Sequence, residues 1–208
     1  MRSAIVLAGG HSARFGKDKG LQLLMGKTMI ECVYSRLTDV VDEVIVVVGS
    51  RPKEELYSKI LSECTVTSDD SAISGPLMGV SKGLRTVMGR KAVITGCDMP
   101  FISRDLLSLL FEMCQGYGAA IPRWPSGYVE PLHSVYDVVS CKIATDKALA
   151  AGRVDLRAMV SNLQRVIYVS TEAIRRLHQD LTMFHNVNTA GDLREARRLL
   201  ASQKLGQG

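Results

Sequence analysis

A group of glycines and basic residues near the N-terminus has the composition of a phosphate-binding loop. The apolar run of residues 4–8 ends at Gly9-Gly10, and Arg14, Lys17 and Lys19 stand within six positions of one another further on. Two glycines let the backbone take positive φ and approach a ligand closely. Backbone N–H groups and cations supply donors and positive charge to a ligand that carries only acceptors and negative charge. We therefore predict that this loop binds a polyphosphate.

The loop belongs to neither of two well-known phosphate-binding classes. A P-loop needs four residues between its glycine and Gly-Lys-Ser/Thr, whereas five residues separate Gly10 from Gly16, and Asp18 stands where the hydroxyl should be. The dinucleotide fingerprint G-x-G-x-x-G is also absent from this stretch. The loop must therefore be interpreted on its own residues.

Asp98 is the residue whose position most favours a metal site. It directly follows the apolar run of residues 91–97, where an aspartate has few structural tasks. Mg²⁺ prefers one or two carboxylates, with substrate phosphates at its remaining positions. We predict that Asp98 holds Mg²⁺; the structural alternative is a capping role ahead of the helix that follows Ser103.

Alternating strands and helices must position these residues. Continuous apolar β-branched runs, such as residues 43–49, are typical of parallel strands covered on both faces, and segments of helical periodicity separate them. We expect strands at residues 4–8, 43–49, 64–67, 91–97, 118–122, 131–136 and 165–170, and helices at 27–38, 52–62, 76–88, 104–114, 138–151, 155–162 and from 189 onward.

This alternation predicts an α/β fold. We expect one domain over residues 1–203, a Rossmann-like three-layer sandwich with a mostly parallel central sheet, and a frayed tail at 204–208. Ligands of such sheets bind in the crevice outside the carboxyl ends of the strands. The N-terminal loop, the Asp69-Asp70 segment and Asp98 should therefore converge there. Asp69 and Asp70 could instead form an Asx-turn.

Composition and charge exclude several other classes of protein. The net charge of +5 comes from 26 basic and 21 acidic residues that are spread along the chain, and aromatic residues make up 5%. We therefore expect no nucleic-acid partner, since base stacking needs aromatic platforms. Five scattered cysteines indicate unpaired thiols in a reducing compartment. With no apolar run of transmembrane length and no signal-peptide pattern, we expect a cytoplasmic protein that does not bind membranes.

Five short motifs resemble those of the MobA family, the molybdenum cofactor guanylyltransferases. Residues 7–21 match the loop L-A-G-G-x-S-x-R-M-G-x-D-K-x-L, with Phe15 in place of methionine. Residues 97–100 match C-D-M-P, and residues 75–80 match G-P-L-A-G-I/L with Met78 in place of alanine. Residues 130–132 match E-P-L, and residues 184–189 match F-x-N-I/V-N-T. One departure is Gly49, where relatives often end the second strand in asparagine.

The resemblance implies a nucleotidyltransferase fold and the transfer of GMP from GTP to the phosphate of Mo-molybdopterin, with release of pyrophosphate. The implied catalytic residues are Arg14, Lys19 and Asp98, with Mg²⁺ as cofactor on Asp98. The implied nucleotide-binding residues are Leu7, Ala8, Gly9, Gly10, Ser12, Lys19, Gly49, Asp69, Asp70, Gly75, Gly79 and Asp98. The implied acceptor-binding residues are Glu130, Arg153, Asn186 and Asn188.

Several alternatives stay open within this resemblance. Asp69 is favoured over Asp70 for the nucleotide contact, Arg157 competes with Arg153, and both asparagines could simply satisfy local backbone groups. A cytidylyltransferase for the same cofactor, or a sugar-phosphate nucleotidyltransferase, would share the loop and Asp98. The Gly9-Gly10 pair favours guanine, because cytidylyl and sugar-phosphate relatives tend to carry Ala-Gly.

A non-catalytic module that binds nucleotides or delivers the cofactor is the alternative from another class. The presence of Arg14, Lys19 and Asp98 together argues against it, because binding alone does not need all three. The implied partners are the substrates GTP and Mo-molybdopterin, with transient contact to proteins that insert the cofactor and mature molybdoenzymes.

Overall fold

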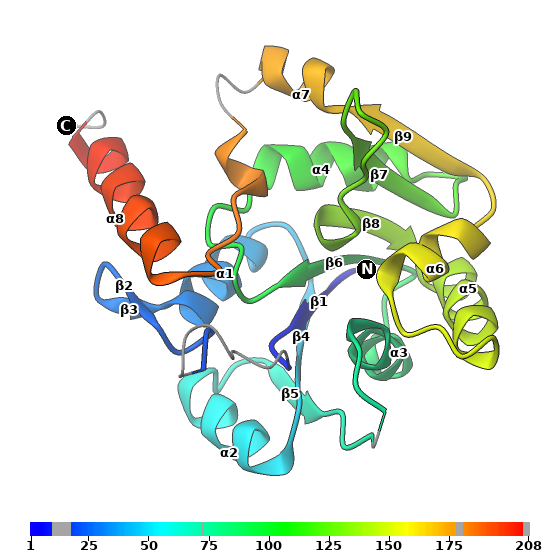
Figure 1. Cartoon of the computed structure of the whole chain (residues 1–208), viewed down its shortest axis with the longest axis horizontal. Coiled ribbons are helices and arrows are strands. Elements are labelled where there is room, and N and C mark those ends of the chain that lie inside the picture. Colours follow the sequence, from blue (N-terminus) through cyan, green and yellow to red (C-terminus); the bar gives the residue numbers. More distant parts are fainter. Residues whose placement is uncertain (10–17, 72, 178–180, 206–208) are drawn as a thin grey trace.

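A central sheet with helices on both faces organises the chain (Figure 1). The computed structural model describes residues 1–9, 18–71, 73–177 and 181–205. The fold class expected from the sequence, an α/β arrangement around a mostly parallel sheet, is confirmed.

The first half of the chain alternates strands and helices. Its strands are β1 (Arg2–Leu7), β2 (Leu23–Leu24), β3 (Lys27–Thr28), β4 (Glu43–Val48), β5 (Thr65–Ser68) and β6 (Lys91–Gly96). Its helices are α1 (Met29–Leu37), α2 (Arg51–Ile60), α3 (Pro76–Thr86) and α4 (Arg104–Met113). Most bounds lie within two residues of those expected from the apolar periodicity.

The second half continues the sheet and adds shorter helices. It contains β7 (Ala119–Arg123), the 3₁₀ turn η1 (Pro131–His133), β8 (Ser134–Asp137), α5 (Val138–Ala150), α6 (Leu156–Asn162), β9 (Val166–Ser170), α7 (Thr171–Leu177), the 3₁₀ turn η2 (Thr182–Phe184) and α8 (Ala190–Leu205). The last helix therefore runs two residues beyond the expected domain end at 203.

The strand order of the described sheet is β5-β4-β1-β6-β8-β7-β9. β1 pairs in parallel with β4 and β6, so that Ile5 lies opposite both Ile45 and Ile94. β8 is antiparallel to β6 and to β7, while β9 forms the far edge, parallel to β7. The carboxyl ends of four neighbouring parallel strands, β5, β4, β1 and β6, thus meet at one edge.

Each central strand is covered on both faces, as its continuous apolar sequence predicts. In β1, Val6 belongs to the apolar cluster that contains residues of α1, α2 and α4. Its neighbour Ile5 belongs to the opposite cluster, with residues of α3, α5 and α6. Successive side chains of a strand point to opposite faces, so one strand supplies both cores.

The helix expected at 27–38 begins at Met29, because Lys27-Thr28 pairs with Leu23-Leu24 as a small hairpin. Thr28 then caps α1 in a reciprocal capping box. Its hydroxyl oxygen accepts from the Glu31 N–H at 3.3 Å, and its own N–H donates to Glu31 Oε2 at 2.7 Å.

The prediction of a strand at residues 131–136 is wrong for its first half. η1 occupies its beginning and β8 its end. Pro131 has no N–H to give a ladder, and the Tyr136 hydroxyl donates to the Pro131 carbonyl oxygen at 2.8 Å. The side-chain bond folds the segment into a turn where an extended strand was expected.

A third, small apolar cluster joins α8 to the start of α1 and the hairpin. Leu24, Met29, Phe101 and Leu193 are buried together there. Arg197 donates from Nη2 to the Leu23 carbonyl oxygen at 2.9 Å. Within the described ranges, no helix combines the length and apolar character needed to cross a membrane.

Candidate nucleotide-transfer site

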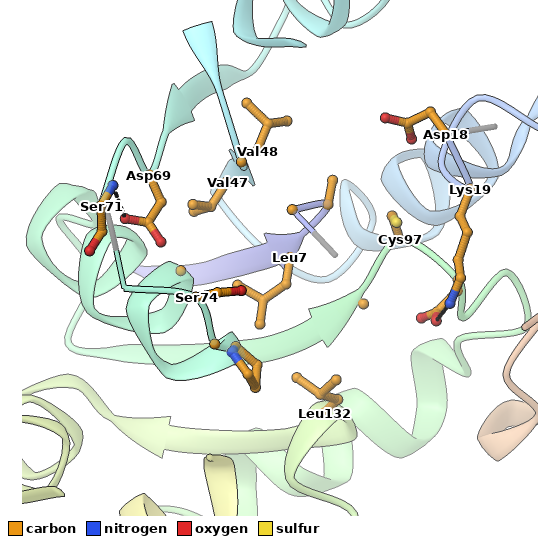
Figure 2. A pocket seen from close by; sticks show the side chains of 18 of the residues that line it. Leu7, Asp18, Lys19, Val47, Val48, Asp69, Ser71, Ser74, Cys97 and Leu132 are labelled. Carbon is orange, nitrogen blue, oxygen red and sulfur yellow. Dashed lines mark hydrogen bonds and ion pairs between the residues drawn. The ribbon is translucent and has the colours of Figure 1, made fainter. Parts of the chain in front are cut away.

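A cavity of about 570 Å³ lies at the edge of the sheet where the parallel strands end. Leu7, Val47 and Leu132 give it apolar walls (Figure 2). Asp69 and Ser71 lie on one side of the cavity, and Asp18 and Lys19 lie on the other. An apolar pocket with a few converging polar groups is the usual form of a small-molecule site.

Segments far apart in the sequence line this cavity. They are residues 7–9 at the end of β1, 47–49 at the end of β4, residues 69, 71 and 73–75 after β5, Pro76 and Gly79 of α3, residues 96–98 at the end of β6, Leu132 of η1, and Asp18-Lys19. The described ends of the N-terminal loop, the Asp69 segment and Asp98 therefore lie together at the carboxyl edge, as expected from the sequence.

Lys19 and Asp98 form the charged centre of the cavity. Lys19 Nζ lies 3.5 Å from Asp98 Oδ2 and donates to Asn188 Oδ1 at 2.7 Å. The two charged side chains keep 24% and 22% of their surface exposed, so both can meet a ligand. The Asp98 carbonyl oxygen also accepts from the Val187 N–H at 2.8 Å. These contacts bring the segment before α8 to the end of β6.

Backbone packing explains the glycines at the ends of β1 and β4. An added Cβ at Gly49 would lie 3.0 Å from the Gly9 carbonyl oxygen, and one at Gly9 would lie 3.3 Å from the Gly49 nitrogen. The two strand ends thus approach backbone to backbone. A side chain at position 49 would require the two strand ends to move apart by a few tenths of an ångström.

The structure distinguishes the two aspartates after β5 by position. Asp69 lines the cavity, with its Oδ1 accepting from the Ser71 N–H at 3.3 Å. Asp70 is exposed, and its Oδ2 accepts from the Ser68 hydroxyl at 3.2 Å. The cavity position agrees with the preference for Asp69; its contact with a nucleotide stays a prediction.

Gly75 and Gly79 have steric reasons to be glycine. An added Cβ at Gly75 would lie 2.5 Å from Val154 Cβ, and the Leu77 N–H donates to the Val154 carbonyl oxygen at 3.1 Å. One at Gly79 would lie 3.2 Å from Leu7 Cδ2. The start of α3 therefore packs tightly against the α5–α6 connection and against the floor of the cavity.

The predicted acceptor residues divide into two groups. None of the four, Glu130, Arg153, Asn186 and Asn188, is among the described residues that line the cavity, but Asn188 contacts Lys19, which does line it. Arg153 pairs with Asp155, its Nη2 lying 2.9 Å from Asp155 Oδ2.

Glu130 and Arg157 are also held by local contacts. Glu130 accepts at 2.6 Å from Trp124 Nε1, and its burial raises the pKa of its carboxyl group. Arg157, the alternative to Arg153, stacks over the Tyr128 ring at 5.7 Å.

Three predicted residues of the loop, Gly10, Ser12 and Arg14, lie outside the described residues. The cavity also includes residues that the sequence reasoning did not select. Asp18 precedes Lys19 in the loop motif, and Leu132 ends the E-P-L motif, so both stood within motifs already recognised. Ser71 and Ser74 carried no such signal.

The described lining of the cavity includes carboxylates, a lysine and a cysteine, but no histidine. Burial, reinforced by the Asp98 and Asp18 carboxylates, raises the pKa of the Cys97 thiol, so it stays protonated at neutral pH. A protonated thiol is a poor nucleophile. Among the residues with described positions, no three His, Cys, Asp or Glu side chains gather as a metal cage.

Comparison with known proteins gives a consistent result. The family model described as the MobA-like NTP transferase domain matches residues 4–166. A protein of Methanosarcina mazei named "Probable molybdenum cofactor guanylyltransferase" is 36% identical over 198 residues, which cover 92% of this chain and 88% of that protein. A protein of Pelotomaculum thermopropionicum with the same name is 34% identical over 208 residues, which cover 99% of this chain and 96% of that protein.

A solved structure agrees with the sequence relatives. The crystal structure of molybdopterin-guanine dinucleotide biosynthesis protein A from Archaeoglobus fulgidus superposes with a TM-score of 0.82 at 28% identity. The match covers 97% of this chain and all of that chain (100%). The similarity therefore includes both halves of the sheet and the C-terminal segment.

Proposed function

The chain belongs to the MobA-like NTP transferase family, and from this premise we propose that it transfers GMP from GTP to the phosphate of Mo-molybdopterin, releasing pyrophosphate. The names of its relatives support the nucleotide and the acceptor. The arrangement of the cavity supports the reaction type.

One observation carries this proposal. A lysine from the N-terminal loop and an aspartate from the end of β6 face each other across 3.5 Å at the edge of a cavity that several strand ends surround. Nucleotidyl transfer, like phosphoryl transfer, depends on positioning and charge neutralisation more than on covalent help from the protein. Lys19 would balance the negative charge that grows on the triphosphate as pyrophosphate leaves.

Asp98 would hold the Mg²⁺ ion. Because no larger cage of metal ligands exists among the described residues, the donor set suits an ion that takes one or two carboxylates and fills its other positions with phosphate oxygens and water. When bound, Mg²⁺ would neutralise phosphate charge and orient the α-phosphate for attack.

The attacking group brings its own reactivity. A phosphate monoester has a second pKa near about 6 and is mostly dianionic at neutral pH. It therefore needs no general base, which agrees with the lack of histidine in the described lining. The task of the protein is to place two anions close together and to offset their repulsion.

The two substrates would occupy different halves of the chain. GTP would lie over the ends of β1, β4 and β6, with Asp69 near its ribose or base. The acceptor would approach from the C-terminal half, where Val187 and Asn188 reach Asp98 and Lys19. Glu130 and Asn186 would contact the acceptor farther out, as would Arg153 or Arg157. Proteins that insert the cofactor into molybdoenzymes would receive the product.

The test combines binding and turnover. Calorimetry with GTP, CTP, ATP and UTP, each with Mg²⁺ and with EDTA, measures nucleotide choice. Pyrophosphate release with Mo-molybdopterin, and the mass of the dinucleotide product, measure transfer. We expect selective, Mg²⁺-enhanced binding of GTP and formation of the guanine dinucleotide.

Each alternative has its own signature. Preference for CTP would keep the site but assign the protein as a cytidylyltransferase. GTP binding without pyrophosphate release in the presence of acceptor would indicate a binding module. Transfer to a sugar phosphate in place of Mo-molybdopterin would assign another acceptor on the same fold.

A further inference from the structure

The carboxylate of Asp18, one residue before Lys19, is bound on both oxygens by helix α2. Tyr57 donates its hydroxyl to Asp18 Oδ1 at 2.6 Å, and Lys53 Nζ lies 2.7 Å from Asp18 Oδ2. The Gly20 N–H adds a second hydrogen bond to Oδ1, at 3.1 Å, while the contact of Lys53 with Oδ2 is an ion pair. A carboxylate with this many partners has little freedom to rotate.

Tyr57 makes this contact from within the apolar core. Its side chain is fully buried, with no exposed surface, in the cluster between the sheet and α1, α2 and α4. A buried hydroxyl without a partner is costly, and a carboxylate is a strong acceptor. Burial raises the pKa of Tyr57, so its hydroxyl keeps the proton that it donates to Asp18.

The turn that follows Asp18 is shaped around the same hydroxyl. An added Cβ at Gly20 would lie 2.3 Å from the Tyr57 hydroxyl oxygen, so any other residue would displace it. The Gly20 carbonyl oxygen accepts from the Ile30 N–H at 2.9 Å, and the Gln22 N–H donates to the Lys19 carbonyl oxygen at 3.0 Å. The backbone on either side of Lys19 is thereby tied to α1 and α2.

Lys19 and Asp18 extend in different directions from the backbone (Figure 2). Asp18 points to α2, whereas Lys19 reaches the Asp98 carboxylate and Asn188. Fixing the side chain of Asp18 fixes the peptide between the two residues, and with it the direction in which Lys19 leaves the backbone.

We propose that Tyr57, acting through Asp18, is a positioning residue that orients Lys19 toward the triphosphate; this inference rests on the proposed nucleotidyl transfer. Tyr57 itself is not among the described residues that line the cavity. Lys53 binds the same Asp18 carboxylate from a more exposed position on α2, with 34% of its side chain accessible.

The test compares three variants with the wild-type protein. Tyr57→Phe removes only the hydroxyl, and Lys53→Met removes the ion-pair partner of Asp18 Oδ2 from a partly exposed position; thermal unfolding of each variant checks that it is folded. Tyr34→Phe is the matched control, because Tyr34 packs against the same apolar cluster and is not among the described cavity residues.

We expect Tyr57→Phe to lower kcat about ten- to a hundredfold, because a small misplacement of a catalytic group has effects of this size. The Kd for GTP with Mg²⁺ should change by less than about threefold, which separates a loss in the transition state from a loss of binding. Lys53→Met should show a smaller fall in kcat, and Tyr34→Phe should match the wild type in both quantities.

A second readout needs no substrate. Hydrogen exchange of the amides of residues 18–24 should be faster in Tyr57→Phe than in the wild type or in Tyr34→Phe. Absence of transferase activity in the wild type would refute the proposed function while leaving this comparison intact. Unchanged kcat in both Tyr57→Phe and Lys53→Met, or unchanged exchange at residues 18–24, would overturn the positioning role. So would a loss of GTP binding with kcat preserved.

Discussion

Replacement of Asp98 by asparagine should lower activity far more than stability. The change removes one negative charge but keeps the size of the side chain and the backbone bond from the Val187 N–H. The carboxylate lies 3.5 Å from Lys19 Nζ, and both side chains are only about a quarter exposed, at 22% and 24%.

The effect on stability follows from these numbers. At 3.5 Å the attraction of the pair is about 5 kcal/mol for an effective dielectric constant of about 20, before desolvation. Removal of two charges from water offsets most of it, and Lys19 keeps Asn188 as a partner. We expect a net loss of about 1 kcal/mol, which lowers the Tm of a chain of this size by about 2–4 °C.

The effect on turnover should be larger. Loss of one group that stabilises developing charge in the transition state typically costs about 10²–10³-fold in kcat. Pyrophosphate release at saturating GTP, Mg²⁺ and acceptor measures this quantity, with thermal unfolding measured on the same samples. Asp146→Asn, on the exposed side of α5, is the charge-matched control and should behave as the wild type. Turnover of Asp98→Asn within about twofold of the wild type would refute the role of Asp98.

Three further changes test other parts of the structure. Gly75→Ala places a Cβ 2.5 Å from Val154 Cβ, so urea unfolding should show a loss of about 1–3 kcal/mol, as overpacking does; an unchanged midpoint would contradict the contact. Burial raises the pKa of the Cys97 thiol, so this cysteine should resist alkylation at pH 7.5 in the native protein, and Cys97→Ala should retain its kcat; rapid alkylation followed by loss of activity would oppose this. Burial lowers the pKa of His133 to about 4. Below about pH 6.5 the imidazole of this residue therefore binds a proton in the unfolded chain but not in the folded one. Its contribution should lower the free energy of unfolding by about 3 kcal/mol between pH 6.5 and pH 4. His133→Leu should flatten that part of the stability–pH curve, and an unchanged slope would exclude the assignment.

The central part of the fold could be predicted from the sequence because its local signals agree with the tertiary arrangement. The apolar run of β4 forms a strand buried on both faces, and Ser103 caps α4 by accepting from the Leu106 N–H at 3.2 Å. η1 was missed because residues 131–136 were expected to form one extended strand, whereas Pro131 cannot donate to a neighbouring strand and its carbonyl oxygen accepts from the Tyr136 hydroxyl. The short helix α7 was also not predicted, because seven residues show too little periodicity.

The candidate site likewise contains residues that could be predicted from the sequence and contacts that could not. Asp69 and Asp98 line the cavity because each stands just after a strand, and strand ends can be located from apolar runs. Lys19 also lines it and was selected from the loop motif. Motif matches also selected Glu130 and Arg153, but the direction of their side chains depends on Trp124 and Asp155, which motif spacing does not describe. The contacts of Asp18 with α2 are equally non-local, so no pattern around residue 18 indicates them.

The hydrogen bond between Lys19 and Asn188 joins residues 169 positions apart. The entropic cost of closing a chain loop grows only with the logarithm of its length, so each doubling of the separation adds only about 0.6 kcal/mol. The separation does set an order of events during synthesis, since the lysine leaves the ribosome long before its acceptor. A growing chain can pair its early strands, yet Lys19 gains its amide partner only after residue 188 has emerged and α8 has packed. Completion of the contacts that join Lys19, Asp98 and Asn188 is therefore among the last steps in the maturation of this polypeptide.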